Sequence, residues 1–351
     1  MHLSIRTNNI KLNKPFKYFL AELTYLPYSL IIIKDNSGFV GQGEAAHSID
    51  ANGELQEGTI FYAPYLNSVL NNFDTVSSIS DIELVMKNVR LNITHNTGLA
   101  CGIEQALFGI LNQKTGKNIT ELLGGIKHEE IYIQTTIPIE KEINSYKQRI
   151  DLIFNNYRPR FVKFKAGVNL KLESEAMHYY RTLDKEVSIS IDANQAFSNV
   201  DEAINFLKMV EDISISWAEQ LLAKDDLCGM KYLREQTTIK LMADESVHLP
   251  LEAEYFCQNN LVDYINIKLA KTGGILKALE IIKIAEKYNK KVMLGSMLHG
   301  KLGIEYNLGF AMSQDFITQD FFSYFTVIET KDLGYINNNL SVTLKSLYGL
   351  E

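Results

Sequence analysis

The amino-acid sequence predicts an α/β protein, a TIM-type (β/α) barrel with an α+β capping domain before it. A chain of 351 residues, of which 46% are hydrophobic, is long enough for a barrel and one smaller domain. From about residue 130, short β-branched runs alternate with longer segments of helical period, a pattern typical of repeated β-α units. The glycine-rich first turn of an open doubly wound sheet is missing, which favours the closed barrel.

Eight short runs, repeating at roughly 25 residues, are the expected barrel strands. Between them lie candidate helices, and in the segment 275–289 the residues Ile275, Ala278 and Ile282 recur at three- and four-residue steps on one face. Such a face can cover a parallel sheet. The runs begin at Ile131, Phe161, Val187, Ser214, Lys240, Tyr264, Lys291 and Asp315.

The first 125 residues lack this repeat. Extended segments at 3–13 and 28–45, the second with a turn at Asn36-Ser37-Gly38, precede a helix-rich stretch. After Asp320 no further β-α unit follows, so we expect the tail to pack back on the capping domain. The expected boundaries are 1–125 for the capping domain, 126–324 for the barrel, and 325–351 for the tail that completes the capping domain.

The net charge of −7 and the lack of a basic cluster disfavour nucleic acid and anionic membranes as partners. No apolar stretch has the length of a signal peptide or a membrane span, and the three cysteines lack metal-ligand spacing. We therefore expect a cytoplasmic protein with a small-molecule substrate. Assembly into a homo-oligomer is left open.

Charged or hydroxyl side chains stand near the C-terminal ends of six successive runs. A buried parallel strand should be almost wholly apolar, because an unpaired buried charge is costly. In a barrel these positions converge on the C-terminal mouth, where active sites lie. The residues are Lys163, Lys165, Asp192, Glu219, Asp244, Lys268 and Ser296.

Three of these residues, Asp192, Glu219 and Asp244, are carboxylates on adjacent strands. Their oxygens can surround one hard divalent cation and leave positions for substrate, which is the arrangement expected for Mg²⁺. The competing interpretation is that each is a surface acid at a strand end. The regular repeat of all three favours the metal site.

The lysines predict proton transfer. Lys163 and Lys165 are two residues apart in one strand and so point to the same side, whereas Lys268 lies on the far side of the mouth. Two lysines flanking a bound substrate can remove a proton from one face of a carbon and return one to the other. The lysine pKa, about 10.4 in solution, must be lowered for this role, and crowded ammonium groups beside a cation would lower it. The alternative is that these lysines are solvated strand ends or ion-pair partners of the acids.

These residues resemble the enolase superfamily, specifically its muconate-lactonizing subgroup and within it the dipeptide epimerases. The resemblance covers almost the whole chain. The segments that carry it are GQGEAA at Gly41, GIEQALFGILNQKTGKNITELLGG at Gly102, KFK at Lys163, DAN at Asp192, WAEQ with Glu219, ADES at Ala243, KLAKTGGI at Lys268 and GSML at Gly295.

The resemblance implies that Lys165 and Lys268 are the acid/base catalysts. It implies a Mg²⁺ ion that helps to stabilise an enediolate, with Lys163 near the substrate carboxylate. Asn194 would support the metal ligands. The implied ligands are Asp192, Glu219 and Asp244, and the implied substrate contacts are Thr136, Lys163, Ser296 and Asp320.

Three departures from the family pattern concern the substrate. The DxD expected near the eighth strand reads Asp320-Phe321-Phe322, so only the first acid is kept. Ala21, after the apolar Tyr18-Phe19-Leu20, stands where the Ala-Glu epimerases tend to carry an arginine. The usual glutamate after the seventh strand is His299, which we expect to be an exposed loop histidine. The apolar segment and the missing arginine predict a pocket less committed to an acidic second residue.

The expected reaction is 1,1-proton transfer at the carbon next to the carboxylate of an L-Ala-Xaa-type dipeptide. An o-succinylbenzoate synthase or related cycloisomerase, with the same lysines, is the alternative that the missing DxD keeps open. A non-catalytic small-ligand-binding protein is a third interpretation. It is disfavoured because all five core residues are present.

Overall fold

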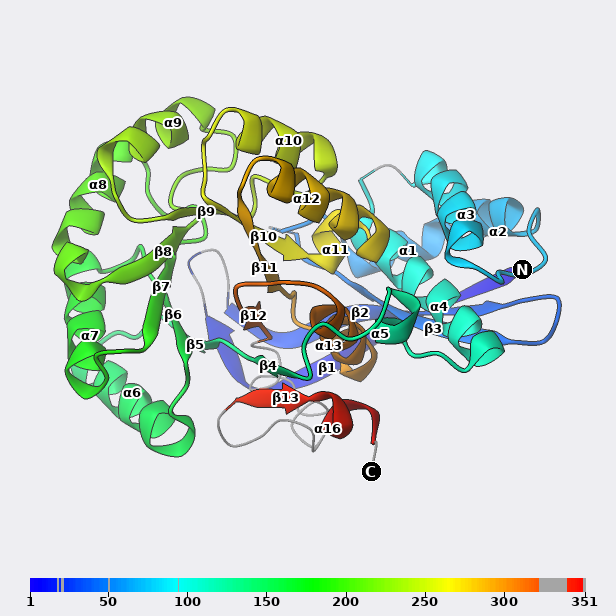
Figure 1. Cartoon of the computed structure of the whole chain (residues 1–351), viewed down its shortest axis with the longest axis horizontal. Coiled ribbons are helices and arrows are strands. Elements are labelled where there is room, and N and C mark those ends of the chain that lie inside the picture. Colours follow the sequence, from blue (N-terminus) through cyan, green and yellow to red (C-terminus); the bar gives the residue numbers. More distant parts are fainter. Residues whose placement is uncertain (18, 20–21, 50, 94, 322–339, 350–351) are drawn as a thin grey trace.

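The computed structural model describes residues 1–17, 19, 22–49, 51–93, 95–321 and 340–349. Figure 1 shows two parts: a ring of strands with helices outside it, and an N-terminal sheet with its own helices packed beside that ring. The expected barrel with a separate α+β domain is confirmed.

The N-terminal part is a three-stranded antiparallel sheet, in the order β1-β2-β3, covered by helices. Its turn lies where the sequence predicted it, with Asp35 Oδ1 accepting from Ser37 N (3.0 Å) and Phe39 N (2.8 Å). A Cβ at Gly43 would lie 1.9 Å from Gly102 O, so glycine lets the sheet approach helix α4. The elements are β1 (His2–Lys17), β2 (Glu22–Lys34), β3 (Val40–Ala46), α1 (Gln56–Phe61), α2 (Ala63–Leu70), α3 (Ile79–Asn92), α4 (Thr97–Thr115) and α5 (Ile119–Leu122).

The barrel sheet has eight parallel strands in sequential order from β5 to β12. Contacts next to its first strand reach its last strand and close the sheet. Ile133 forms a parallel bridge with Gln319, and Gln134 N donates to Gln319 O at 2.7 Å. The strands are β5 (Thr135–Ile137), β6 (Phe161–Lys165), β7 (Ser188–Asp192), β8 (Ile215–Glu219), β9 (Leu241–Ala243), β10 (Tyr264–Lys268), β11 (Lys291–Gly295) and β12 (Gln319–Asp320).

Helices connect these strands, as the sequence pattern predicts. In α12 the residues Ile275, Ala278 and Ile282 are buried, which confirms the predicted apolar face. The connecting elements are α6 (Ile143–Tyr157), α7 (Leu170–Leu183), α8 (Val200–Met209), the 3₁₀ turn η1 (Glu211–Ile213), α9 (Leu227–Gln236), α10 (Pro250–Gln258), α11 (Leu269–Thr272), α12 (Ile275–Lys287) and α13 (Lys301–Ser313).

The first expected run, which begins at Ile131, is not one strand. It is divided into β4 (Glu130–Tyr132) and β5, because β4 pairs antiparallel with β13 (Ser341–Thr343) and only β5 pairs with β6. The helix α16 (Leu344–Tyr348) follows β13, and the Tyr348 hydroxyl lies 2.9 Å from Thr120 Oγ1 in α5. The described tail thus contacts both the start of the barrel segment and α5. The domain boundaries stay a prediction.

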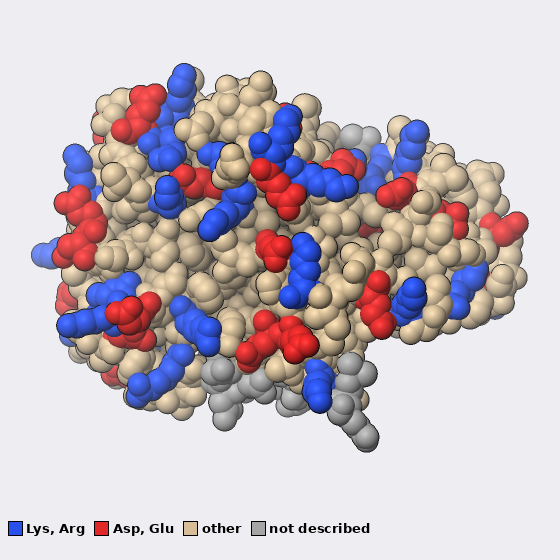
Figure 2. All heavy atoms as spheres, viewed as in Figure 1, with Lys and Arg blue, Asp and Glu red and all other residues tan. Residues whose placement is uncertain are grey.

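Acidic and basic side chains are interspersed over the face shown in Figure 2. This face therefore offers no continuous basic surface to a polyanion. Among the helices of the described residues, none combines the length and the apolar character needed to cross a membrane.

Candidate active site

A cavity of about 630 Å³ lies between the capping domain and the C-terminal ends of the barrel strands. Six of the nine predicted site residues line it: Thr136, Lys165, Asp192, Lys268, Ser296 and Asp320. The remaining three, Lys163, Glu219 and Asp244, are buried among them and are at most 1% exposed. The structure therefore brings the whole predicted set together.

The strand register explains this convergence. In the parallel sheet Lys165 pairs with Asp192, and Asp192 pairs with Glu219, so three charged residues end neighbouring strands at one level. Asp244 directly follows β9, and Lys268 ends β10. The polar strand ends form one cluster because all the strands run in the same direction.

The lysines are held by carboxylates. Lys165 Nζ lies 2.7 Å from Asp192 Oδ2 and 2.6 Å from Asn194 Oδ1. Lys163 Nζ lies 2.7 Å from Glu219 Oε2 and 2.7 Å from Asp320 Oδ2.

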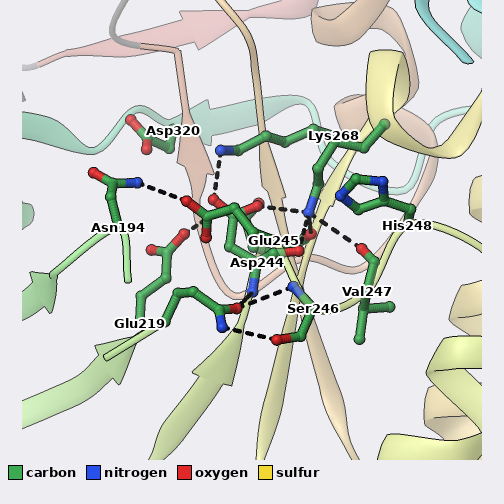
Figure 3. Close-up of polar contacts among 12 residues, drawn as sticks. Asn194, Glu219, Asp244, Glu245, Ser246, Val247, His248, Lys268 and Asp320 are labelled. Atoms are coloured by element: carbon green, nitrogen blue, oxygen red, sulfur yellow. Dashed lines mark hydrogen bonds and ion pairs between the residues drawn. The ribbon is translucent and has the colours of Figure 1, made fainter. Parts of the chain in front are cut away.

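On the other side of the mouth, Lys268 Nζ lies 2.5 Å from Asp244 Oδ2. Figure 3 shows this contact, with Glu219, Asp244 and Glu245 gathered around it. The ion-pair interpretation of these lysines is thus correct for their ground-state contacts. It leaves a catalytic role open, because Lys165 and Lys268 also line the cavity.

The three predicted metal ligands fit a hard cation in their chemistry. Burial and, to a smaller extent, the negative charge of Asp192 together raise the pKa of Glu219 to about 8. Glu219 Oε2 has no hydrogen-bond partner, although the Lys163 ammonium is close to it. Mutual repulsion of buried carboxylates favours a bound cation.

In the part of the chain that the structure describes, no three His, Cys, Asp or Glu side chains are grouped in a geometry that holds a metal ion. Lysine ammonium groups contact the carboxylate oxygens: Lys163 at Glu219, Lys165 at Asp192 and Lys268 at Asp244. The oxygen donors of a Mg²⁺ site are present. The ammonium groups would have to move away from the carboxylates before the carboxylate oxygens could surround an ion.

At Lys163 and Lys268 the lysine pKa is raised, not lowered. Burial lowers the pKa of Lys163, but attraction to Asp320, Glu219 and Asp192 outweighs it, so the net shift is upward. The pKa of Lys268 is also raised, because Asp244 and its acidic neighbours outweigh the effect of burial. The carboxylates around these two lysines raise their pKa by more than burial lowers it.

Two buried side chains of the site, Glu245 and Asn266, were not assigned from the sequence. Glu245 lines the cavity, and burial together with the negative charge of Asp244 raises its pKa to about 7. Asn194 Nδ2 donates to Glu245 Oε1 at 3.1 Å, and Asn266 Nδ2 donates to Glu219 Oε1 at 2.6 Å (Figure 3 for the first pair). Glu245 stands in the ADES segment, where its place beside Asp244 was the available signal.

The expectation of an exposed His299 is wrong. Its side chain is 2% exposed, and its Nδ1 lies 3.2 Å from Glu44 Oε1 of the capping domain. The loop that carries it is held against that domain, so the ring has no access to solvent. Ser296, in the same loop, lines the cavity and donates to Asp320 O at 3.1 Å.

The capping domain supplies a wall of the cavity with an apolar part, which sequence reasoning did not locate. Leu23, Leu26, Pro27, Ile49 and Leu55 belong to it. These residues come from strand and loop positions with no periodic signal. The expected specificity segment Tyr18-Phe19-Leu20-Ala21 has only Phe19 within the described residues, and that side chain is 42% exposed.

The fold and site define a class of protein: a barrel enzyme whose strand ends combine paired lysines with three carboxylates. The family described as "Enolase C-terminal domain-like" matches residues 149–339. The chain therefore belongs to the enolase superfamily.

Individual relatives are similar over most of the chain. The L-Ala-D/L-Glu epimerase of Clostridium acetobutylicum is 30% identical over 318 residues, 89% of this chain and 86% of that protein. The hydrophobic dipeptide epimerase of Enterococcus faecalis is 27% identical over 84% of this chain and 81% of its own. The crystal structure of the Cytophaga hutchinsonii dipeptide epimerase with Mg and D-Ala-L-Val superposes with a TM-score of 0.85, at 26% identity over 93% of this chain and 87% of that one.

Proposed function

We propose that this protein is a Mg²⁺-dependent dipeptide epimerase, which inverts the carbon next to the carboxylate of an L-Ala-Xaa-type dipeptide. The observation that carries the proposal is the placement of Lys165 and Lys268. They lie on β6 and β10, four strands apart in an eight-stranded sheet, and line the same cavity from opposite sides. A carbon bound between them has one lysine toward each face.

In this proposal one lysine takes the proton from the substrate carbon, and the other, as an ammonium, gives a proton to the opposite face. Because the departing and arriving protons use different faces, the configuration inverts. Lys165 is held by Asp192 and Asn194, and Lys268 by Asp244, so both ammonium groups have fixed starting positions. The reverse reaction exchanges their roles.

Asp192, Glu219 and Asp244 would hold the Mg²⁺ ion. The ion would supply positive charge at the substrate carboxylate, where negative charge grows as the proton leaves. Lys163, enclosed by acids beneath the cavity, would add to the same positive field.

The proposed substrate contacts are Thr136, Lys163, Ser296 and Asp320. Asp320 is the candidate for the dipeptide ammonium, since it lines the cavity and its Oδ1 has no hydrogen-bond partner among the described residues. Ser296 fixes the backbone beside it.

The second residue of the dipeptide is proposed to be neutral or apolar. Among the lining residues that the structure describes, Lys165 and Lys268 are the lysines and no arginine is present. Leu23, Leu26 and Leu55 offer an apolar surface instead. The hydrophobic dipeptide epimerase among the relatives supports this preference, whereas the L-Ala-D/L-Glu epimerase is evidence for an acidic one.

Incubation of a dipeptide library in deuterated water with Mg²⁺, read by mass spectrometry, tests the function. A dipeptide that is epimerised gains deuterium at its α-carbon, and chiral chromatography then shows the second epimer. Conversion of a succinylbenzoate precursor, with no dipeptide gaining deuterium, would instead support the cycloisomerase alternative. Cytoplasmic location and assembly into a homo-oligomer stay predictions.

A further inference from the structure

Lys271 is the most enclosed ammonium group of the site and has no role in the reaction proposed above. It lies in α11, one turn after Lys268, and its side chain is 0% exposed. It does not line the cavity, and its hydrogen bonds go to oxygen atoms of Asp244, Val247 and Asn266. Its function must therefore be exerted through the residues that it contacts.

The Lys271 ammonium group has four acceptors. It donates to Asp244 Oδ1 at 2.5 Å, to Asp244 O, to Asn266 O at 3.1 Å and to Val247 O at 3.2 Å. Asp244 and Val247 belong to the loop after β9, whereas Asn266 belongs to β10. One side chain thus joins the loop that carries Asp244 to the strand that carries Lys268.

We propose that Lys271 is a positioning residue for Asp244, which holds Oδ1 and the main chain so that Oδ2 faces the cavity side of the site. The inference rests on the proposed function, in which Asp244 is a metal ligand. Oδ2 is the oxygen that Lys268 contacts, and Lys268 lines the cavity (Figure 3). Lys271 therefore contacts Oδ1 of Asp244, which has the structural role, and Lys268 contacts Oδ2, which has the functional one.

A simple counter-ion would not need this arrangement. Three of the four acceptors are neutral carbonyl oxygens, whose burial requires a donor, and an ammonium group has only three protons to share among them. Neutralising Asp244 alone would require only one contact with its carboxylate. The carbonyl contacts instead set the direction of the loop from Asp244 to Val247.

The positioning role and a charge-only role predict opposite effects on Mg²⁺ affinity. Removing a positive charge near the site should by itself strengthen Mg²⁺ binding, because like charges repel. Removing the group that orients Asp244 should weaken it, by about tenfold or more, as is typical when a partner that orients a metal ligand is lost. The sign of the change thus separates the two roles.

The test is calorimetric titration of Mg²⁺ into the full-length protein, without substrate, for wild type, Lys271→Met and Lys224→Met. Lys224 is an exposed lysine close enough for its charge to act on His248, as that of Lys271 does, and its described hydrogen bonds are with Gln195 and Ser246. We expect about tenfold or weaker Mg²⁺ binding for Lys271→Met and unchanged or slightly stronger binding for Lys224→Met. Equal or stronger binding by Lys271→Met would overturn the assignment.

Lys271→Arg is the second variant, because methionine leaves three carbonyls without a donor. Arginine keeps the charge, but its planar guanidinium cannot reproduce the contacts of an ammonium group. Weaker Mg²⁺ binding is expected here as well, whereas wild-type affinity would support a charge-only role. If circular dichroism shows that neither variant folds, Lys271 is a structural residue and the positioning role is wrong. Wild-type protein that binds no Mg²⁺ would contradict the proposed function, not this inference.

Discussion

Individual residues of the site could be predicted where a charged side chain stands at a position that the fold is expected to bury. Lys165, Asp192 and Lys268 are charged side chains at positions where a parallel strand should be apolar, and that conflict located them. Asn266 and Lys271 were given no role, because Asn266 carries no charge and Lys271 stands after the end of its strand. Their role depends on the neighbouring strands, which only the fold brings together.

At Lys268 the two-lysine mechanism makes a specific prediction. Lys268→Ala should abolish epimerisation in both directions, since one of the two faces then has no proton donor or acceptor. Exchange of the α-proton on the face toward Lys165 should continue for one epimer. Proton NMR in deuterated water measures the exchange, and chiral chromatography measures inversion.

Lys277→Ala is the control for this variant, because Lys277 pairs with Glu280 on the partly exposed surface of α12 and lies outside the cavity. It should retain wild-type rates of both exchange and inversion. Inversion by Lys268→Ala at the wild-type rate would rule out the two-lysine mechanism.

At Asp244 we predict that metal binding and activity fall together. Asp244→Asn removes the negative charge that would bind Mg²⁺, and leaves the Lys268 and Lys271 ammonium groups without a charged partner. Activity should also disappear after exhaustive chelation and return when Mg²⁺ is added. Atomic absorption and turnover assays check both; full activity in protein shown to be free of metal would contradict the proposal.

Among the elements, those with a strong periodic pattern were predicted and those defined by remote pairing were not. The apolar face of α12 and the strands from β6 to β12 correspond to the patterns of their own residues. The division of the first run into β4 and β5 depends on β13, which lies about two hundred residues later in the sequence. The residue pattern of the run itself does not indicate that it pairs with so distant a strand.

Two carboxylates of the capping domain join its elements to barrel helices. Glu44 in β3 accepts from Gly300 N at 2.7 Å and Gly303 N at 3.2 Å, at the start of α13. Glu104 in α4 accepts from Leu276 N at 3.2 Å, at the start of α12, and from Arg90 at 2.8 Å. Both helices follow strands whose ends line the cavity, so these contacts fix the barrel loops against the capping wall.

We predict that Glu104→Ala lowers the free energy of unfolding by about 1–3 kcal/mol, because buried donors lose their acceptor. Gly274 is packed against this carboxylate, with the position of a Cβ only 2.2 Å from Glu104 Oε1, so no larger neighbour fills the gap. Thermal unfolding measures the change. Glu280→Ala, which breaks an exposed pair, is the control and should change the unfolding midpoint little; equal effects of the two variants would contradict the role of Glu104.

At the scale of the whole molecule, the cavity exists only where the two parts meet. The barrel contributes its polar strand ends, and the capping domain contributes the apolar wall, so the site has a reactive side and a recognition side. The reactive side was predictable because it repeats with the β-α unit. The recognition side was not, because its residues follow no repeat: Leu23, Leu26 and Pro27 lie on β2, and Ile49 and Leu55 lie between β3 and α1.

We therefore expect the capping wall to decide the substrate preference. Leu23, Leu26 and Leu55 can pack against an apolar second side chain, while an anionic one finds no arginine among the described lining residues and has Glu54 and Glu57 near it. One methylene more or less in an apolar pocket changes discrimination by about 1–3 kcal/mol, which reaches roughly a hundredfold. We predict that L-Ala-L-Leu and L-Ala-L-Phe are epimerised with kcat/KM within about a hundredfold of L-Ala-L-Glu or better. Steady-state rates with the three dipeptides decide this, and exclusive use of L-Ala-L-Glu would contradict the proposed neutral or apolar preference.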